Sequence, residues 1–330
     1  MPSGTKYILQ RLGLSLLSLF VVANILFFMF RLLPGDPATA MADPSLPQNV
    51  REAIIAQYGL DRPLWEQYVL YFKALAVGEL GHSYHFKEPV AGLLVGRALN
   101  TFILMGSAII LAFLIGPVIG AFMAWNRNTL VDTYGIGIVI AMNAAPVFWT
   151  GIIAIMIFSF QLDLLPSGGM TSFDNEGTTF LGRVLSFDFL YHLVLPLTVT
   201  AAYYLSPPTF VMRNTMIDIL GADFIEMKRA QGLPELRVLY AHAARNSLLP
   251  VAHLGAIQIG FAFGGSVIIE QVFSWPGAGR LLWTAVESQD YPLAQGAFLI
   301  LAAIIITMNF LVDALSVYID PRVSEEEVNV

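Results

Sequence analysis

Six long runs without a charged residue constrain this chain more than any other feature of its sequence. Each run has at least 19 residues and contains no Asp, Glu, Lys or Arg. A helix needs roughly 20 apolar residues to cross about 30 Å of hydrocarbon, and a charge at its centre costs about 2.5–3.5 kcal/mol. We therefore predict an all-α integral membrane protein with six transmembrane helices, at residues 12–30, 98–126, 133–162, 189–212, 246–269 and 291–312.

The composition argues against the main alternatives to a helical membrane protein. Charged residues make up 12% of the 330 residues, whereas a soluble domain has about 25%. Strands of a transmembrane barrel would alternate polar and apolar residues, but these runs are apolar on every face. The first run continues into Arg31 and Pro34 without a small-residue cleavage pattern, so we interpret it as an uncleaved anchor. The chain has no cysteine, which excludes disulfides and thiolate metal sites.

The distribution of Lys and Arg predicts the orientation in the membrane. Six spans place both termini on one side, together with the 213–245 loop. That side holds nine basic residues, whereas the shorter loops of the other side hold three, and loops longer than about 60 residues count little. The positive-inside rule therefore predicts cytoplasmic termini. The nine are Lys6, Arg11, Arg127, Arg213, Lys228, Arg229, Arg237, Arg245 and Arg322, and the three are Arg31, Arg183 and Arg280.

A segment of nearly 70 residues between the first two spans predicts an external helical subdomain. Residues 48–58 look helical up to Gly59, and a second amphipathic helix is expected from about Pro63 to Ala76. The segments 34–97, 163–188 and 270–290 together form the predicted external surface.

The long cytoplasmic loop, residues 213–247, contains a short helix with its own start and stop signals. Asp223 predicts the start, either as the N-cap or as an acid near the positive end of a helix that begins slightly earlier. Gly232 is a natural residue to follow the last turn, and Pro234 cannot continue that helix. A second helix is expected to start at Pro234 and to run into the fifth span.

An apolar stripe on this short helix suggests a contact surface. Leu220, Phe224 and Met227 follow the spacing i, i+4, i+7. Such a helix can dock on a partner protein or lie on the bilayer, and the physics of the sequence favours neither.

Two segments of the loop carry a family resemblance. They read Glu226-Met-Lys-Arg229-Ala230-Gln-Gly232-Leu233 and His242-Ala-Ala-Arg245-Asn246-Ser-Leu-Leu-Pro250. This pattern resembles the cytoplasmic signature loop of ABC importer permeases, in the version of the dipeptide, oligopeptide and nickel group. The general motif is Glu-Ala-Ala, three residues and Gly. Here Met227 and Lys228 replace the two alanines, as in the peptide group.

Shorter motifs extend the resemblance over nearly the whole chain, each at the expected topological place. They are Arg31-Leu-Leu-Pro-Gly-Asp-Pro37, Tyr58-Gly-Leu-Asp-Arg-Pro63, Gly78-Glu-Leu-Gly-His-Ser83, Pro146-Val-Phe-Trp149, Val272-Phe-Ser-Trp-Pro-Gly-Ala-Gly-Arg280, Asp290-Tyr-Pro292 and Asp320-Pro-Arg322.

The resemblance implies the type I ABC importer permease fold and a division of the chain. Residues 1–97 would form the N-terminal transmembrane helix and external segment, residues 98–317 the permease domain, and residues 318–330 a cytoplasmic tail. Within the 213–247 loop, the implied ATPase-coupling residues are Asp223, Phe224, Glu226, Met227, Arg229, Ala230, Gly232 and Leu233. We expect Glu226 and Arg229 to contact the ATPase or to brace the helix at i, i+3.

The resemblance also implies a pore subunit that is not itself an enzyme. The sequence contains no Gly-x-x-x-x-Gly-Lys-Ser/Thr phosphate loop. ATP would be used by two separate cytoplasmic ABC ATPase subunits, and no cofactor is expected on this chain. The other implied partners are a second homologous permease, the lipid bilayer and an extracytoplasmic solute-binding protein that docks on the external surface. The net charge of −7 gives no reason to expect nucleic acid.

Alternatives to an importer subunit remain at this point. A secondary transporter or channel would work without an ATPase, although no long internal repeat supports one built from inverted halves. A membrane protease is disfavoured because the chain has no His-Glu-x-x-His motif. The cargo stays open among dipeptides, longer peptides, glutathione, nickel chelates and sugars. Two polar side chains in or beside the spans are expected to have structural roles: Asn143 bonding between helices, and Asp313 bonding nearby backbone or a basic residue.

Overall fold

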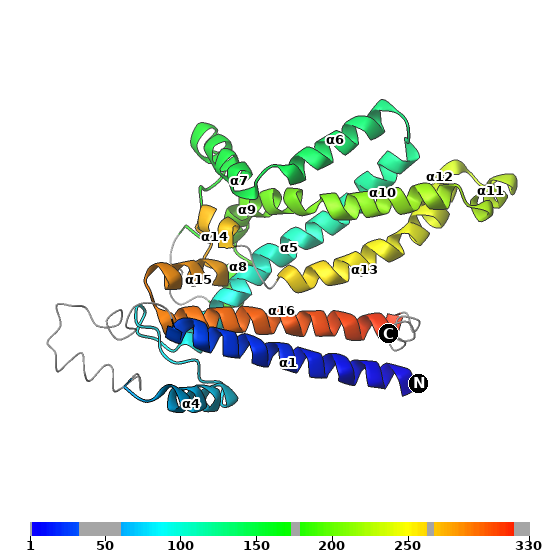
Figure 1. The fold of residues 1–330 in the computed structure, drawn as a ribbon. Helices are drawn as coiled ribbons and strands as arrows, with labels where there is room; N and C mark the ends of the chain where they lie inside the picture. The colour runs from blue at the N-terminus through cyan, green and yellow to red at the C-terminus, as the bar shows by residue number, and fades with distance from the viewer. Residues whose placement is uncertain (1, 33–60, 173–178, 263–266, 320–330) are drawn as a thin grey trace. The chain divides into compact units, whose positions relative to one another are not determined.

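The structure is a computed structural model and describes residues 2–32, 61–172, 179–262 and 267–319. Within these ranges the chain is helical and has no strand; one isolated bridge joins His82 and Pro89. The helices (Figure 1) are α1 (Pro2–Leu32), α4 (Leu64–Ala76), α5 (Val90–Trp125), α6 (Leu130–Ala144), α7 (Val147–Ile155), α8 (Phe180–Val184), α9 (Phe187–Tyr204), α10 (Ser206–Leu220), α11 (Asp223–Ala230), α12 (Glu235–Arg237), α13 (Arg245–Ala262), α14 (Val267–Val272), α15 (Ala278–Glu287) and α16 (Tyr291–Ile319), with π-helical segments η1 (Met156–Gln161) and η2 (Val238–Ala244).

The chain forms two compact units. Unit 1 joins the two ends of the sequence, Met1–Asn100 and Pro276–Val330, and unit 2 is the continuous stretch Thr101–Trp275. The long helix α5 contributes its first turns to unit 1 and the remainder to unit 2.

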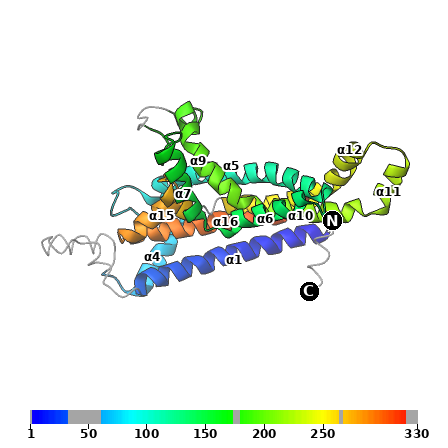
Figure 2. The ribbon, with the colours of Figure 1, turned by 90° about the horizontal axis from the view of Figure 1, so that it is seen from above.

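In unit 1, α1 and α16 lie side by side and antiparallel, as both views show (Figures 1 and 2). Arg11 Nη1 lies 3.3 Å from Asp313 Oδ2 at one end of the pair. At the other end the rings of Phe30 and Tyr291 lie 5.9 Å apart. The ion pair confirms that Asp313 bonds a basic residue, and the antiparallel packing places the beginning of α1 beside the end of α16.

A buried aspartate fixes the start of α16. Asp290 accepts hydrogen bonds from Ser83 Oγ at 2.5 Å, from the His85 backbone N–H at 3.0 Å and from the Leu293 backbone N–H at 3.2 Å. The bond from Leu293 is that of an N-cap, because Asp290 immediately precedes the helix. Two of the sequence motifs, around Ser83 and Asp290, therefore meet across 207 positions of sequence.

Among the described residues, three helices are long and apolar enough to cross a membrane, at Lys6–Leu32, Val90–Trp125 and Tyr291–Leu311. Two bent helix pairs, Leu130–Ala144 with Val147–Gln161 and Phe187–Tyr204 with Ser206–Leu220, raise the number to as many as five. The prediction of six spans is thus met in part. The candidate near 246–269 corresponds to α13, which does not pass the same test, and residues 263–266 lie outside the described part.

Prolines explain both bends. The predicted span 133–162 is not straight, because α6 and α7 meet at 93°. The break falls at Ala145 and Pro146, where Ala145 is extended as residues before proline tend to be. The bend between α9 and α10 is 40°, and Pro207 and Pro208 occupy the first turn of α10, where proline is tolerated.

The helix predicted from about Pro63 to Ala76 is present as α4. The helix predicted at 48–58 lies outside the described residues.

Small residues bring α5 and α10 into close contact in unit 2. A Cβ atom at Gly120 would lie 2.3 Å from the Thr209 carbonyl oxygen, so only glycine fits this approach. A Cβ atom at Gly116 would lie 2.9 Å from Pro208 Cγ of the same helix. Asn143 Nδ2 donates to the Tyr203 carbonyl at 3.1 Å, which confirms a bond between helices.

Candidate functional site

The predicted loop 213–247 folds as a helical excursion of unit 2. It comprises the end of α10, the short helix α11, a turn at Pro234, and a helix that continues through α12 and η2 into α13. The second helix therefore begins where the sequence predicts. The two long helices α10 and α13 pack on each other, and α11 lies beyond their joined ends (Figure 1).

The start of α11 differs from the first of the two expectations for Asp223. Ala222 is the extended N-cap residue, and no side chain caps the helix. Asp223 is instead the first helical residue, and Glu226 lies in the same turn. Both carboxylates stabilise the positive end of the helix, while Lys228 and Arg229 lie in its last turn.

The end of α11 is a Schellman motif, as the Gly-Leu-Pro sequence predicts. Gly232 has φ of +74°, and its N–H donates to the Arg229 carbonyl at 2.9 Å. The Leu233 N–H donates to the Lys228 carbonyl at 3.4 Å. A Cβ at Gly232 would meet nothing within 4 Å, so glycine is required here for its backbone conformation alone.

One apolar side chain anchors α11, and sequence reasoning missed it. Ile225 is fully buried in a cluster with Met216 of α10 and with Val238 and Leu239 of η2. The predicted apolar stripe was counted from Leu220 as if one helix continued to Met227. The helix is interrupted at Gly221 and Ala222, so that spacing did not select Ile225.

The other predicted apolar residues of α11 are exposed. Phe224 is 37% exposed and Met227 is 53% exposed. These two side chains lie away from the core that holds Ile225, and charged residues surround them in the sequence. The helix thus presents an apolar pair within a polar surface, the anatomy typical of a small protein-contact site.

The predicted brace between Glu226 and Arg229 is not formed. Arg229 Nε instead lies 3.3 Å from Glu235 Oε1, across the turn at Pro234. Both partners are substantially exposed, so this pair contributes little to stability. Glu226 is exposed and makes no ion pair with the described part of the chain. Ala230 is the last residue of α11 and is exposed.

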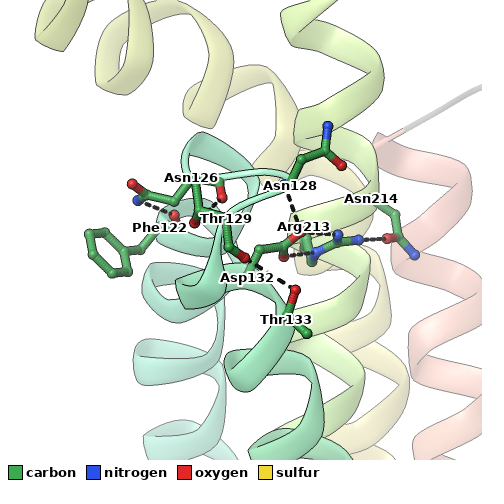
Figure 3. A network of polar contacts seen from close by, with 8 residues as sticks. All are labelled: Phe122, Asn126, Asn128, Thr129, Asp132, Thr133, Arg213 and Asn214. Atoms are coloured by element: carbon green, nitrogen blue, oxygen red, sulfur yellow. Dashed lines mark hydrogen bonds and ion pairs between the residues drawn. The ribbon is translucent and has the colours of Figure 1, made fainter.

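A buried ion pair ties α10 to the first turn of α6 (Figure 3). Arg213 donates to both oxygens of Asp132, from Nε and Nη2, at 2.7 Å each. The Asn128 backbone N–H adds a longer bond of 3.4 Å to the same carboxylate. The side chains are 6% exposed for Asp132 and 16% exposed for Arg213. This bidentate geometry is the strongest form of an Arg–carboxylate contact.

Sequence reasoning counted Arg213 only as a charge of the loop and did not select Asp132. Each of them lies beside a charge-free run, where an isolated charge needs a partner. This position is the sequence feature that could have indicated the ion pair. Arg213 lies on α10, the helix that directly precedes α11 in the chain. Among the described residues, no group of three or more His, Asp or Glu side chains could hold a metal ion.

Two protein families match this chain. The model described as "binding-protein-dependent transport system inner membrane component" matches residues 116–325. A second model, for the N-terminal part of such membrane components, matches residues 5–105. Together the two matches extend over most of the sequence, including the ion pair and α11.

Several named proteins are similar to this chain over nearly their full length. A putative peptide permease protein of Brucella suis is 37% identical over 322 residues, covering 96% of this chain and 98% of the relative. The dipeptide transport system permease protein DppB of Escherichia coli K12 is 33% identical over 337 residues, covering 98% and 99%. The oligopeptide transport system permease protein AppB of Bacillus subtilis is 35% identical over 319 residues, covering 96% and 98%.

Proposed function

This chain belongs to the family of binding-protein-dependent transport system inner membrane components, and we propose that it forms half of the translocation pathway of a peptide importer. It is a multi-pass membrane permease of the ABC importer type and not itself a catalytic subunit. Relatives named for dipeptide and oligopeptide transport support peptides as the cargo class. The other half of the pathway would be a second, homologous permease.

We assign six spans with both termini in the cytoplasm. Antiparallel packing of α1 and α16 supports an even number of crossings, since both termini then lie on one side. Three single helices and two bent pairs would give five, and α13 is the remaining helix of 18 residues. The excess of Lys and Arg in the loop around α11 supports its cytoplasmic location. Helix α4 then lies on the external side, where the solute-binding protein would dock.

The observation that carries the coupling role is the division of α11 into a buried and an exposed part. Ile225 holds the helix on α10 and η2, whereas Phe224 and Met227 are left for a partner. A cytoplasmic ABC ATPase is the occupant we propose, because the family requires one and this chain has no phosphate loop. Closure of the ATPase dimer would move α11 and, through α10 and α13, the spans that follow.

Co-purification of the complex tests this role. The chain is expressed with its second permease and two ATPases, and ATPase recovery and ATP-driven uptake in proteoliposomes are measured. The double variant Phe224→Ser, Met227→Ser should insert into the membrane like wild type. It should no longer co-purify with the ATPases, and ATP-driven uptake should be lost. The matched control, for ATPase recovery alone, replaces Leu64 and Trp65, two exposed apolar neighbours on the external helix α4, by serine.

Two results would contradict the proposal. Full ATPase recovery with the α11 double variant would show that α11 is not part of the interface with the ATPase. Uptake by the chain alone that is insensitive to ATP depletion would instead identify a secondary transporter or channel.

A further inference from the structure

Unit 1 contains a cavity with both polar and apolar walls. It has a volume of about 230 Å³ and is lined by the last turn of α1, by α4, by residues 79–84 and by the start of α16. A single water needs only about 10–15 Å³ of such space. The cavity therefore accommodates a group of many atoms.

The half-buried guanidinium of Arg31 lines this cavity and forms no ion pair with the described residues, although the Glu79 carboxylate belongs to the same lining. The Arg31 Nε atom is buried and makes no hydrogen bond within the described chain. The guanidinium lies 5.7 Å from the ring centre of Phe27, a contact that leaves its N–H groups available. A buried charge is costly unless it is paired, so the site favours an anion.

A second polar group points to the same ligand. The Tyr71 hydroxyl of α4 is buried, and the described residue that interacts with it is Gln295, through a contact that lacks close hydrogen-bond geometry. Burial raises the pKa of this hydroxyl above its ordinary value, so it remains a donor at neutral pH. Arg31 and Tyr71 thus offer two donors to one anionic group.

The position of Arg31 relative to the membrane narrows the choice of anion. It lies in the last turn of α1, whose residues Lys6–Leu32 form a candidate span. Its guanidinium is therefore expected at the level of the lipid head groups. The lining also has an apolar part, which includes Leu70, Leu75 and Leu299.

We propose that this cavity binds one phospholipid, with its phosphate on Arg31 and Tyr71 and part of an acyl chain against the leucine wall. The carboxylate of Glu79 also lines the cavity. One cation and one anion together match a zwitterionic head group, so the ligand class is a phosphatidylethanolamine. The assignment uses the membrane placement of α1 in the proposed function, but it does not depend on import.

Native mass spectrometry of the intact transporter tests the proposal. The purified complex is titrated with phosphatidylethanolamine, with phosphatidylglycerol and with inorganic phosphate. Wild-type protein should retain one more phosphatidylethanolamine than Arg31→Gln, with binding weakened about 10–100-fold in the variant. Tyr71→Phe keeps the ring and the packing and should weaken binding several-fold. The control, Arg62→Gln, removes an exposed arginine paired with Glu66 at 2.8 Å and should bind like wild type.

The outcomes separate this inference from the proposed function. Equal lipid retention by wild type and Arg31→Gln would overturn the site. Retention of phosphate or of a cargo peptide in place of lipid would assign the cavity to a free anion and overturn the lipid. ATP-driven uptake measured on the same preparations reports on import, so loss of uptake with lipid binding intact would overturn only the importer.

Discussion

Removal of one partner from the Asp132–Arg213 pair should destabilise unit 2 far more than removal of both. Asp132→Asn keeps the shape of the side chain but removes its charge. The Arg213 side chain, which is 16% exposed, then keeps its charge while its two 2.7 Å contacts are reduced to neutral or mismatched bonds. Figure 3 shows that the guanidinium also reaches Asn214, but at 3.2 Å this neutral amide cannot replace a carboxylate.

The expected magnitude follows from the burial of both groups. Breaking a buried ion pair on one side typically costs about 3–5 kcal/mol, whereas replacing both partners by apolar residues is often neutral. For a unit of this size, about 2–4 °C of melting temperature corresponds to each kcal/mol. Asp132→Asn should therefore lower the melting temperature by about 6–20 °C, and the double variant Asp132→Leu, Arg213→Met should recover most of the loss.

Thermal unfolding of the intact complex in nanodiscs measures the cycle, with Arg213→Met as the second single variant. The reasoning is refuted if both single variants melt within about 2 °C of wild type. It is equally refuted if the double variant loses as much melting temperature as the two single variants together, because the coupling between the two residues would then be zero.

Three further substitutions probe the contacts of α10 and α11. Gly120→Ala would place a Cβ 2.3 Å from a backbone oxygen of α10 and should cost about 1–3 kcal/mol, whereas Gly137→Ala on α6 meets nothing within 4 Å and should be neutral or stabilising; equal melting temperatures would contradict this. Ile225→Ala should cost about 2–5 kcal/mol locally and increase hydrogen exchange in α11 while α10 stays protected, and unchanged exchange would deny its anchoring role. Gly232→Ala should cost about 1–2 kcal/mol, because residue 232 has φ of +74°, and should reduce ATP-coupled uptake. Gly232→Asn should retain more uptake, since asparagine tolerates that conformation. Lower uptake with asparagine than with alanine would contradict a backbone cause.

Local chemistry made most of the helical organisation predictable. The charge-free runs predicted the positions of the long helices, because the cost of a charge in hydrocarbon acts on each residue separately. The end of α11 was predictable because Gly232 and Pro234 act on their own neighbours. The break at Pro146 was also present in the sequence, but a run of apolar residues does not report that the helix axis turns by 93°.

Contacts between distant residues could not be predicted in the same way. Asp132 and Arg213 are 81 positions apart, and Ser83 and Asp290 are 207 positions apart. Nothing near either residue specifies its partner, since the pairing depends on how the helices pack. Ile225 was missed for a related reason: its burial depends on η2, which returns to α11 only after the turn at Pro234.

The composition of unit 1 from the two ends of the chain has a consequence for biogenesis. Helix α1 packs on α16, which leaves the ribosome long after it. At about 5–20 residues per second, the synthesis of the intervening chain takes roughly 10–50 s. During that interval the face of α1 that later contacts α16 meets only lipid or the insertion machinery, while unit 2, being continuous, can pack as it emerges. Truncation before α16 should therefore leave α1 inserted but unpartnered, a form that quality-control proteases would recognise.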